Sequence, residues 1–303
     1  MGGCGRDAVR MARGAGDEGS IASRRGAKSV AKLAGKDGQP LSQNDWEAYF
    51  RYGAQPANRA MKRMLHALPS EPRCGFCGAP FSGFGATLVR PFGFRPSRKN
   101  PNICAACVES APPGGATTEA GILFADLRGF TALSEKMSPA QSTAMLRHFY
   151  AHAASVFYPE ALIDKLIGDE VMALYIPHFM RPGTMQISDE SRRTTAEVML
   201  RHARELLARV GYGGPTGPEV ALGIGLDFGE VFIGNIGDET ARDFTAVGDV
   251  VNTASRLQSH AAGGEIVLSA RLAGYLDQLP GELEQLEVKG KAEPVAAYRI
   301  RPA

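Results

Sequence analysis

Residues 121 to 269 alternate short apolar segments of strand character with longer segments of helical period, and this alternation limits the fold more than any other feature. The strand-like segments are GILFADL (121–127), ALIDKLIG (161–168), EVMALYIP (170–177), VALGIGLDFGEVFIGNIG (220–237) and EIVLS (265–269). Helical patterns cover 139–158, 191–210 and 248–261. IGDEV and LDFGEV are predicted as tight turns. Hairpin and crossover signals therefore occur together, which predicts an α+β domain with helices on one face of a mixed sheet.

The size and charge of the chain exclude several classes of protein. Its 303 residues, 44% of them hydrophobic, are enough for one sizeable domain and a smaller module. Lysine and arginine (34) nearly balance aspartate and glutamate (32), so no overall field attracts nucleic acid or an anionic membrane. No apolar run reaches the length of a membrane span, and none follows Met1 as in a secretory signal. We expect a cytoplasmic protein without stable membrane insertion.

The first third of the chain divides into a tail, a cysteine-containing module and a linker. Residues 1–40 are rich in glycine, alanine and charge and are predicted to be disordered. Residues 41–108 begin with helical spacing that fits one or two short helices, and continue into the cysteines. A proline- and glycine-rich stretch predicts a linker at 109–118. A second domain is then expected over 119–301.

Four of the five cysteines form two CxxC pairs, Cys74 with Cys77 and Cys104 with Cys107, separated by 26 residues. Two such pairs bring four thiolates to one point, which favours a structural, tetrahedral zinc site. An iron–sulfur cluster and a redox dithiol are the alternatives. The spacer alternates phenylalanines with arginines, and we favour packing around the metal over nucleic-acid binding for it.

Asp126 and Asp169 follow apolar strands that we expect to be neighbours. Taken alone, Asp169 is typical of a hairpin turn, and Glu170 of a strand edge. Two carboxylates at adjacent strand ends repel unless a cation lies between them, and magnesium or manganese fits such a site. The segment DLRGFTAL adds backbone amides at a predicted helix start, at Phe130 and Thr131, that can hold phosphate. Together these features indicate nucleotide chemistry.

Five motifs in this region resemble the class III nucleotidyl cyclase catalytic domain over residues 118–301. They are FADLRGFTALSEKM (124–137), DKLIGDEVMALY (164–175), GEVFIGNIG (229–237), FTAVGDVVNTASRLQS (244–259) and VKGKAEP (288–294). The resemblance implies a ferredoxin-like palm, and a head-to-tail homodimer with active sites built from both chains. It also implies that Asp126 and Asp169 hold two Mg²⁺ or Mn²⁺ ions. One ion helps the ribose 3′-hydroxyl to attack the α-phosphorus, and the other neutralises the leaving pyrophosphate.

The same resemblance assigns roles to five further residues. Asn252 would orient the ribose, and Arg256 would meet charge that develops in the transition state. Lys289 would hold the terminal phosphates. Lys165 and Thr245 would face the purine edge. The ammonium of Lys165 can donate to N1 of adenine but meets a donor on guanine, which favours ATP. The Thr245 hydroxyl can serve either base.

These residues predict an adenylate cyclase that makes 3′,5′-cyclic AMP and pyrophosphate from ATP. Three alternatives stay open at this point. The domain can be a guanylate cyclase, or a nucleotide-binding regulatory domain without turnover. The third alternative is a nucleic-acid-binding zinc module that a cyclase-like domain merely dimerises.

Overall fold

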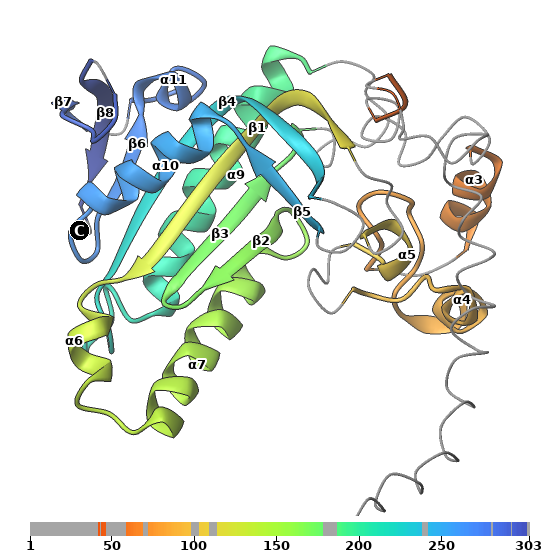
Figure 1. Cartoon of the computed structure of the whole chain (residues 1–303), viewed down its shortest axis with the longest axis horizontal. Coiled ribbons are helices and arrows are strands. Elements are labelled where there is room, and N and C mark those ends of the chain that lie inside the picture. Colours follow the sequence, from red (N-terminus) through yellow and green to blue (C-terminus); the bar gives the residue numbers. More distant parts are fainter. Residues whose placement is uncertain are drawn as a thin grey trace, which may run out of the picture.

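The computed structural model describes residues 42, 44–46, 59–68, 72–97, 103–108, 114–177, 187–237, 242–279, 281–291 and 293–301 (Figure 1). The predicted disordered tail lies outside the described residues. The strands are β1 (Gly114–Leu127), β2 (Leu162–Ile167), β3 (Glu170–Tyr175), β4 (Leu222–Gly237), β5 (Arg242–Val247), β6 (Ile266–Ser269), β7 (Leu283–Leu286) and β8 (Val295–Ile300). The helices are α3 (Arg59–Ala67), α4 (Gly83–Val89), η3 (Arg90–Phe92), α5 (Ala105–Val108), α6 (Phe130–Ser134), α7 (Pro139–Phe157), α9 (Asp189–Arg209), α10 (Asp249–His260) and α11 (Ala270–Ala273).

The strands form one mixed sheet in the order β2-β3-β1-β4-β6-β8-β7, and β5 pairs with β4 beside this path. The β4–β6 pair is parallel, and the other pairs are antiparallel. This confirms the α+β fold with a mixed sheet and matches the palm expected for the cyclase domain. No helix in the described part of the chain is long and apolar enough to cross a membrane.

Helices cover both faces of the sheet, which corrects the prediction that they lie on one (Figure 1). Successive residues of β1 point to opposite faces. Leu123 and Ala125 pack in one cluster with buried residues of α7 and α9. Ile122 and Phe124 pack on the other face with residues of α10. Asp126 is separated from Phe124 by two positions, so its side chain lies on the same face of β1, the face covered by α10.

Strand β1 starts earlier than the sequence indicated, and β4 is continuous where a turn was predicted. β1 begins at Gly114 rather than at residue 121, because it pairs with β4 from Gly114 opposite Asn235 onwards. A Cβ added at Gly115 would overlap the backbone of β4, so glycine serves close strand approach here. The prediction that LDFGEV is a turn is wrong, since β4 runs through it without interruption. A Cβ at Gly225 would overlap the backbone of α10, which lies against this strand.

The IGDEV turn is confirmed as the connection between β2 and β3. Gly168 adopts a positive φ of 60°, a conformation that glycine tolerates best. Near the other end of β2 the register shifts between Ile163 and Lys165. Asp164 is the extra residue of this bulge and has no opposite partner in β3. Bulges of this kind turn a side chain away from its regular direction.

The four-cysteine module, here residues 72–97 and 103–108, packs directly against the cyclase-like domain. Its buried side chains and those of the α10 side of the sheet form one continuous cluster. Of the phenylalanines in the spacer, Phe81 is buried and Phe94 packs against the cluster. Phe84 and Phe92 are each 72% exposed, so the packing predicted for the spacer phenylalanines does not extend to these two.

Candidate functional site

Three acidic residues, Asp126, Asp169 and Glu170, lie near one another where β1 ends beside the β2–β3 hairpin. Asp126 lies opposite Glu170 in the β1–β3 register, and the Leu127 amide donates to the Asp169 carbonyl at 3.1 Å. The structure therefore brings together the two predicted metal ligands. Burial raises the pKa of Asp126, which Arg128 opposes and Asp169 reinforces. Burial, Asp126 and Asp169 together raise the pKa of Glu170 to about 7.

These pKa directions show that the acidic cluster carries more negative charge than its surroundings stabilise. Arg128 supplies part of the missing positive charge, with Nη1 3.2 Å from Asp126 Oδ1. Its Nη2 donates to the Gln258 carbonyl, and its buried Nε has no hydrogen-bond partner among the described residues. A cluster of hard oxygen donors with unbalanced charge fits divalent cations such as Mg²⁺. Arg128 and Glu170 both lie inside the cyclase-like motifs; Glu170 was predicted only as a strand-edge residue, and no role was predicted for Arg128.

The two predicted purine-facing residues lie close to aspartates that the sequence analysis did not single out. Lys165 Nζ is 3.9 Å from Asp243 Oδ2. Thr245 Oγ1 donates to Asp164 Oδ2 at 2.7 Å, and both side chains are buried. Asp243 and Thr245 are two apart in β5 and therefore share a face of that strand. The signal for Asp164 was available, since it is the only acid inside the apolar segment ALIDKLIG.

Helix α10 presents Asn252 and Arg256 on the face turned away from the sheet. The opposite face packs on the sheet through Val250, Thr253, Ala254, Leu257 and Gln258. Asn252 is exposed, and Arg256 is half-buried. The four-residue spacing places both side chains on one stripe of the helix.

Arg256 also approaches the turn between β7 and β8 that carries the predicted phosphate-binding lysine. A Cβ added at Gly290 would lie 3.3 Å from Arg256 Nη2, and Gly290 has a φ of 81°. Lys289 is exposed directly before it. The neighbouring Lys291 forms an ion pair with Asp249 in the first turn of α10. Lys289 therefore extends into solvent and forms no ion pair with the part of the chain that the structure describes.

Phe130 and Thr131 open the short helix α6 just beyond the acidic cluster. Gly129 caps the helix in a left-handed conformation, with a φ of 73°. Thr131 is exposed and Phe130 is half-buried. The chain thus turns sharply between Asp126 and α6, as the segment DLRGFTAL predicted.

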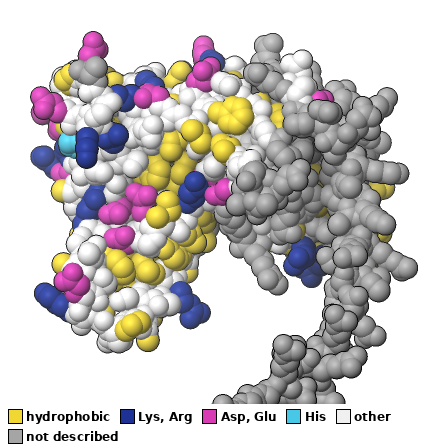
Figure 2. Space-filling view, viewed as in Figure 1, with side chains coloured by type: hydrophobic (Ala, Val, Ile, Leu, Met, Phe, Trp, Pro, Cys, Tyr) yellow, Lys and Arg dark blue, Asp and Glu magenta, His cyan; other side chains and the backbone are white. Residues whose placement is uncertain are grey.

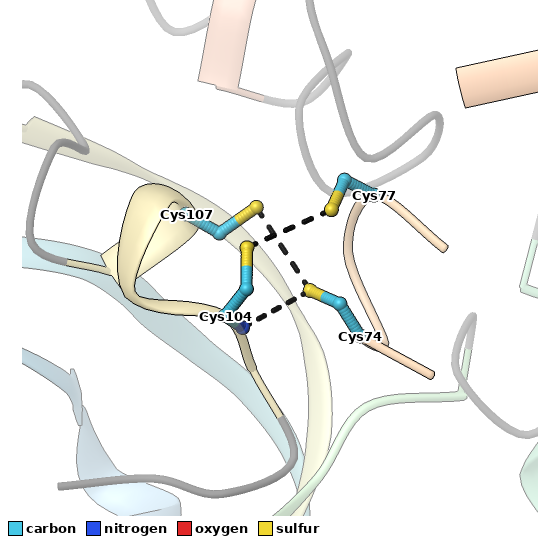
Figure 3. Close-up of side chains that lie close together, drawn as sticks. All are labelled: Cys74, Cys77, Cys104 and Cys107. Atoms are coloured by element: carbon cyan, nitrogen blue, oxygen red, sulfur yellow. Dashed lines mark hydrogen bonds between the residues drawn. The ribbon is translucent and has the colours of Figure 1, made fainter. Parts of the chain in front are cut away.

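The four cysteines converge as the paired CxxC motifs predicted (Figure 3). All four are buried, and their sulfur atoms lie within 4.8 Å of one another. Cys74 Sγ is 3.9 Å from Cys107 Sγ, and Cys77 Sγ is 3.7 Å from Cys104 Sγ. The Cys104 amide donates to Cys74 Sγ at 3.2 Å. Contact with Cys104, together with burial, raises the pKa of the Cys107 thiol. This group can hold a metal ion.

Comparison with known proteins agrees with this geometry. The family described as the adenylate and guanylate cyclase catalytic domain matches residues 115–301, which is more than half of the chain. The chain belongs to this family. It is 28% identical over 286 residues to an adenylate cyclase of Anabaena cylindrica, covering 90% of this chain and 52% of that protein. That alignment is longer than the family match and so extends into the cysteine-containing part of this cyclase-family chain.

Two further relatives show how much of the chain is shared. A terminal-differentiation-specific adenylate cyclase of Dictyostelium discoideum is 28% identical over 188 residues, covering 59% of this chain and 8% of that protein. The crystal structure of the adenylyl cyclase CyaB from P. aeruginosa superposes with a TM-score of 0.51 at 25% identity, covering 62% of this chain and 95% of that one. The chain therefore spans about half of the length of the Anabaena cyclase and less than a tenth of the Dictyostelium cyclase.

Proposed function

We propose that this chain is an adenylate cyclase, which converts ATP to 3′,5′-cyclic AMP and pyrophosphate at sites shared between two copies of the chain. The observation that carries the proposal is the acidic cluster of Asp126, Asp169 and Glu170 in a chain of the cyclase family. Burial and neighbouring negative charge raise the pKa of Asp126 and of Glu170, as expected for a site that lacks positive charge. The divalent cations that accompany a triphosphate substrate supply such charge.

Each proposed site residue of this chain has its own role in the reaction. Asp126 and Asp169 would hold two Mg²⁺ or Mn²⁺ ions, which supply Lewis-acid activation of the 3′-hydroxyl and neutralisation of the phosphates. Arg256 stabilises charge on the α-phosphate, and Asn252 holds the ribose. Lys289 and the amides at Phe130 and Thr131 bind phosphate oxygens.

The choice of ATP rests on Lys165. An ammonium only donates hydrogen bonds, and adenine N1 accepts one whereas guanine N1 carries a hydrogen. Asp243, at 3.9 Å, holds the lysine beside β5. The alternatives of a guanylate cyclase and of a binding domain without turnover predict other products or none.

A homodimer explains why apolar side chains stay exposed beside the site. Leu166, Ile167, Phe232 and Val247 are 39% to 53% exposed. Figure 2 shows hydrophobic side chains gathered on the face that Figure 1 presents, bordered by acidic and basic ones. Patches of this kind mark protein interfaces. A second copy would cover them and place its own α10, with Asn252 and Arg256, over the acidic cluster.

We also propose one zinc ion in the four-cysteine module. Zinc–sulfur bonds of about 2.3 Å in a tetrahedron separate the sulfurs by about 3.8 Å. The sulfur pairs at 3.7 Å and 3.9 Å match this edge. An iron–sulfur cluster distributes its thiolates over several irons, which suits a group confined within 4.8 Å less well. Elemental analysis of the purified, reduced protein tests this, with one zinc per chain expected.

Mixing two inactive variants tests the shared-site cyclase. Asp126→Ala removes a metal ligand, and Arg256→Ala removes the transition-state cation from the other side of the site. Heterodimers of the two contain one intact site, so cyclic AMP formation should return to about a quarter of the wild-type rate. Mixed chains that exchange subunits but stay inactive would refute the shared geometry.

A further inference from the structure

A buried hydrogen bond links the bulge of β2 to the base-reading strand β5. Asp164 is the extra residue of the bulge and is only 5% exposed. Its Oδ2 accepts a hydrogen bond of 2.7 Å from Thr245 Oγ1. Thr245 is also 5% exposed. The bulge thus turns a carboxylate toward the hydroxyl that the sequence places at the purine edge.

The direction of this hydrogen bond fixes what Thr245 can offer to a base. A hydroxyl carries one hydrogen and two acceptor lone pairs, and a carboxylate only accepts. Once Thr245 donates to Asp164, its hydroxyl can only accept on its remaining side. The ambiguity of threonine, which can otherwise donate or accept, is removed by its neighbour.

An acceptor at Thr245 and a donor at Lys165 form a pattern that matches one purine. The edge of adenine presents an amino group that donates and N1 that accepts. The edge of guanine presents O6 that accepts and N1–H that donates. The amino group of adenine can therefore donate to Thr245, and its N1 can accept from Lys165. Guanine would instead place the acceptor O6 against the acceptor Thr245, and the donor N1–H against the donor Lys165.

We propose that Asp164 is a specificity-determining positioning residue, which holds Thr245 as an acceptor and thereby selects ATP over GTP. This rests on the proposed function, in which Lys165 and Thr245 face the purine. Asp164 acts through Thr245 and does not touch the substrate. Its role is distinct from that of Asp243, whose pair with Lys165 is about one-third exposed.

The test compares Asp164→Asn, Thr245→Val and the double variant with the parent, using kcat/KM for ATP and for GTP in Mn²⁺. An asparagine amide can donate to Thr245 as well as accept from it, so the hydroxyl becomes free to turn. The ATP:GTP ratio of kcat/KM should fall about tenfold in Asp164→Asn, the scale of one mispaired buried group. Thr245→Val should lower it similarly. The double variant should fall no further, because both changes remove one interaction.

Two controls separate specificity from folding. Glu160→Gln alters another carboxylate, which precedes β2 and accepts from Arg201 and His202, and should leave the ratio unchanged. Thr245→Ser keeps a hydroxyl and should keep the ratio. If Asp164→Asn does not fold, Thr245→Val against Thr245→Ser still tests the acceptor.

The outcomes distinguish the two levels of the proposal. A parent-like ATP:GTP ratio in Asp164→Asn or Thr245→Val, with or without a fall in total activity, would mean a structural role only and would overturn the inference. If the parent forms no cyclic product, the proposed function fails. The ratio of dissociation constants for ATP and GTP then tests Asp164 in the same variants, with the same tenfold change expected and an unchanged ratio overturning it.

Discussion

The ring of Phe76 lies edge-on to the ring of Phe244, with centroids 5.7 Å apart and planes at 85°. Phe76 stands between Cys74 and Cys77 of the four-cysteine module, and Phe244 stands between Asp243 and Thr245 in β5. The contact therefore joins the four-cysteine knuckle to strand β5, which carries Thr245. Edge-to-face aromatic pairs of this geometry add stability beyond the area they bury.

Because the module and the sheet share one buried cluster, we expect their stabilities to be coupled. Phe76→Ala should lower the free energy of unfolding by about 3 kcal/mol, since Phe76 is 1% exposed. Urea unfolding followed by circular dichroism, with exposed Phe84→Ala as the matched control, measures this. Chelation of the metal should move the same transition. A catalytic-domain transition that stays in place while the module unfolds separately would contradict the coupling.

Loss of a single ligand from the acidic cluster should remove turnover but keep the fold. Asp126→Ala should reduce kcat/KM by about a hundredfold or more, because metal activation supplies several kcal/mol. The melting temperature should stay near that of the parent or rise, since a partly buried carboxylate with a raised pKa is removed. Substantial cyclase activity in this variant, at saturating Mn²⁺, would refute the metal assignment.

Acid should destabilise the domain through a buried histidine. His202 Nδ1 is 3.1 Å from the Tyr175 hydroxyl, and Nε2 is 3.0 Å from Glu160 Oε2. Burial lowers the pKa of His202 below its usual 6.5, although Glu160 opposes the shift. The unfolded chain therefore binds the proton first, so stability is complete above about pH 6.5 and falls as pH drops toward the folded pKa.

The pKa of Glu160 extends this acid loss to lower pH. Burial alone would raise the pKa of Glu160, but hydrogen bonds from Arg201 and His202 outweigh burial and lower it. The contribution of Glu160 to folding stability is complete above its pKa in the unfolded chain, and it is lost as pH falls through its lower pKa in the folded protein. His202→Gln should flatten the stability curve below about pH 6.5, measured as melting temperature against pH. An unchanged slope there would assign the acid loss to other groups.

Replacement of Lys165, the lysine that we propose reads the base, should change the substrate preference. Lys165→Glu presents an acceptor to guanine N1–H and a repelling lone pair to adenine N1, so the ATP:GTP ratio of kcat/KM should fall by about one to two decades. Lys289→Glu changes the exposed lysine that we propose binds phosphate oxygens, and should lower kcat/KM for ATP and for GTP by the same factor. If Lys165→Glu kept the parent's ratio, Lys165 would not read the purine.

The sequence predicted the local features of this protein better than its long-range contacts. The positions of Asp126 near the end of β1 and of Asp169 in the β2–β3 turn were predicted, because strand ends and the IGDEV hairpin depend on nearby residues. Gly115 was assigned to a linker, because its strand role depends on the backbone of β4, more than a hundred residues away. The Thr245–Asp164 bond spans 81 residues. It depends on a bulge and on the short strand β5, neither of which has a distinct pattern in the sequence.

The most direct test of adenylate cyclase activity is product identification with the purified full chain. The protein is incubated with Mn²⁺ and either ATP or GTP, and nucleotides are separated and identified by mass spectrometry while pyrophosphate is quantified. We predict cyclic AMP and pyrophosphate in equal amounts, with a higher kcat/KM for ATP than for GTP. A metal-loaded, folded protein that forms no cyclic nucleotide, or that forms cyclic GMP more efficiently than cyclic AMP, would contradict it.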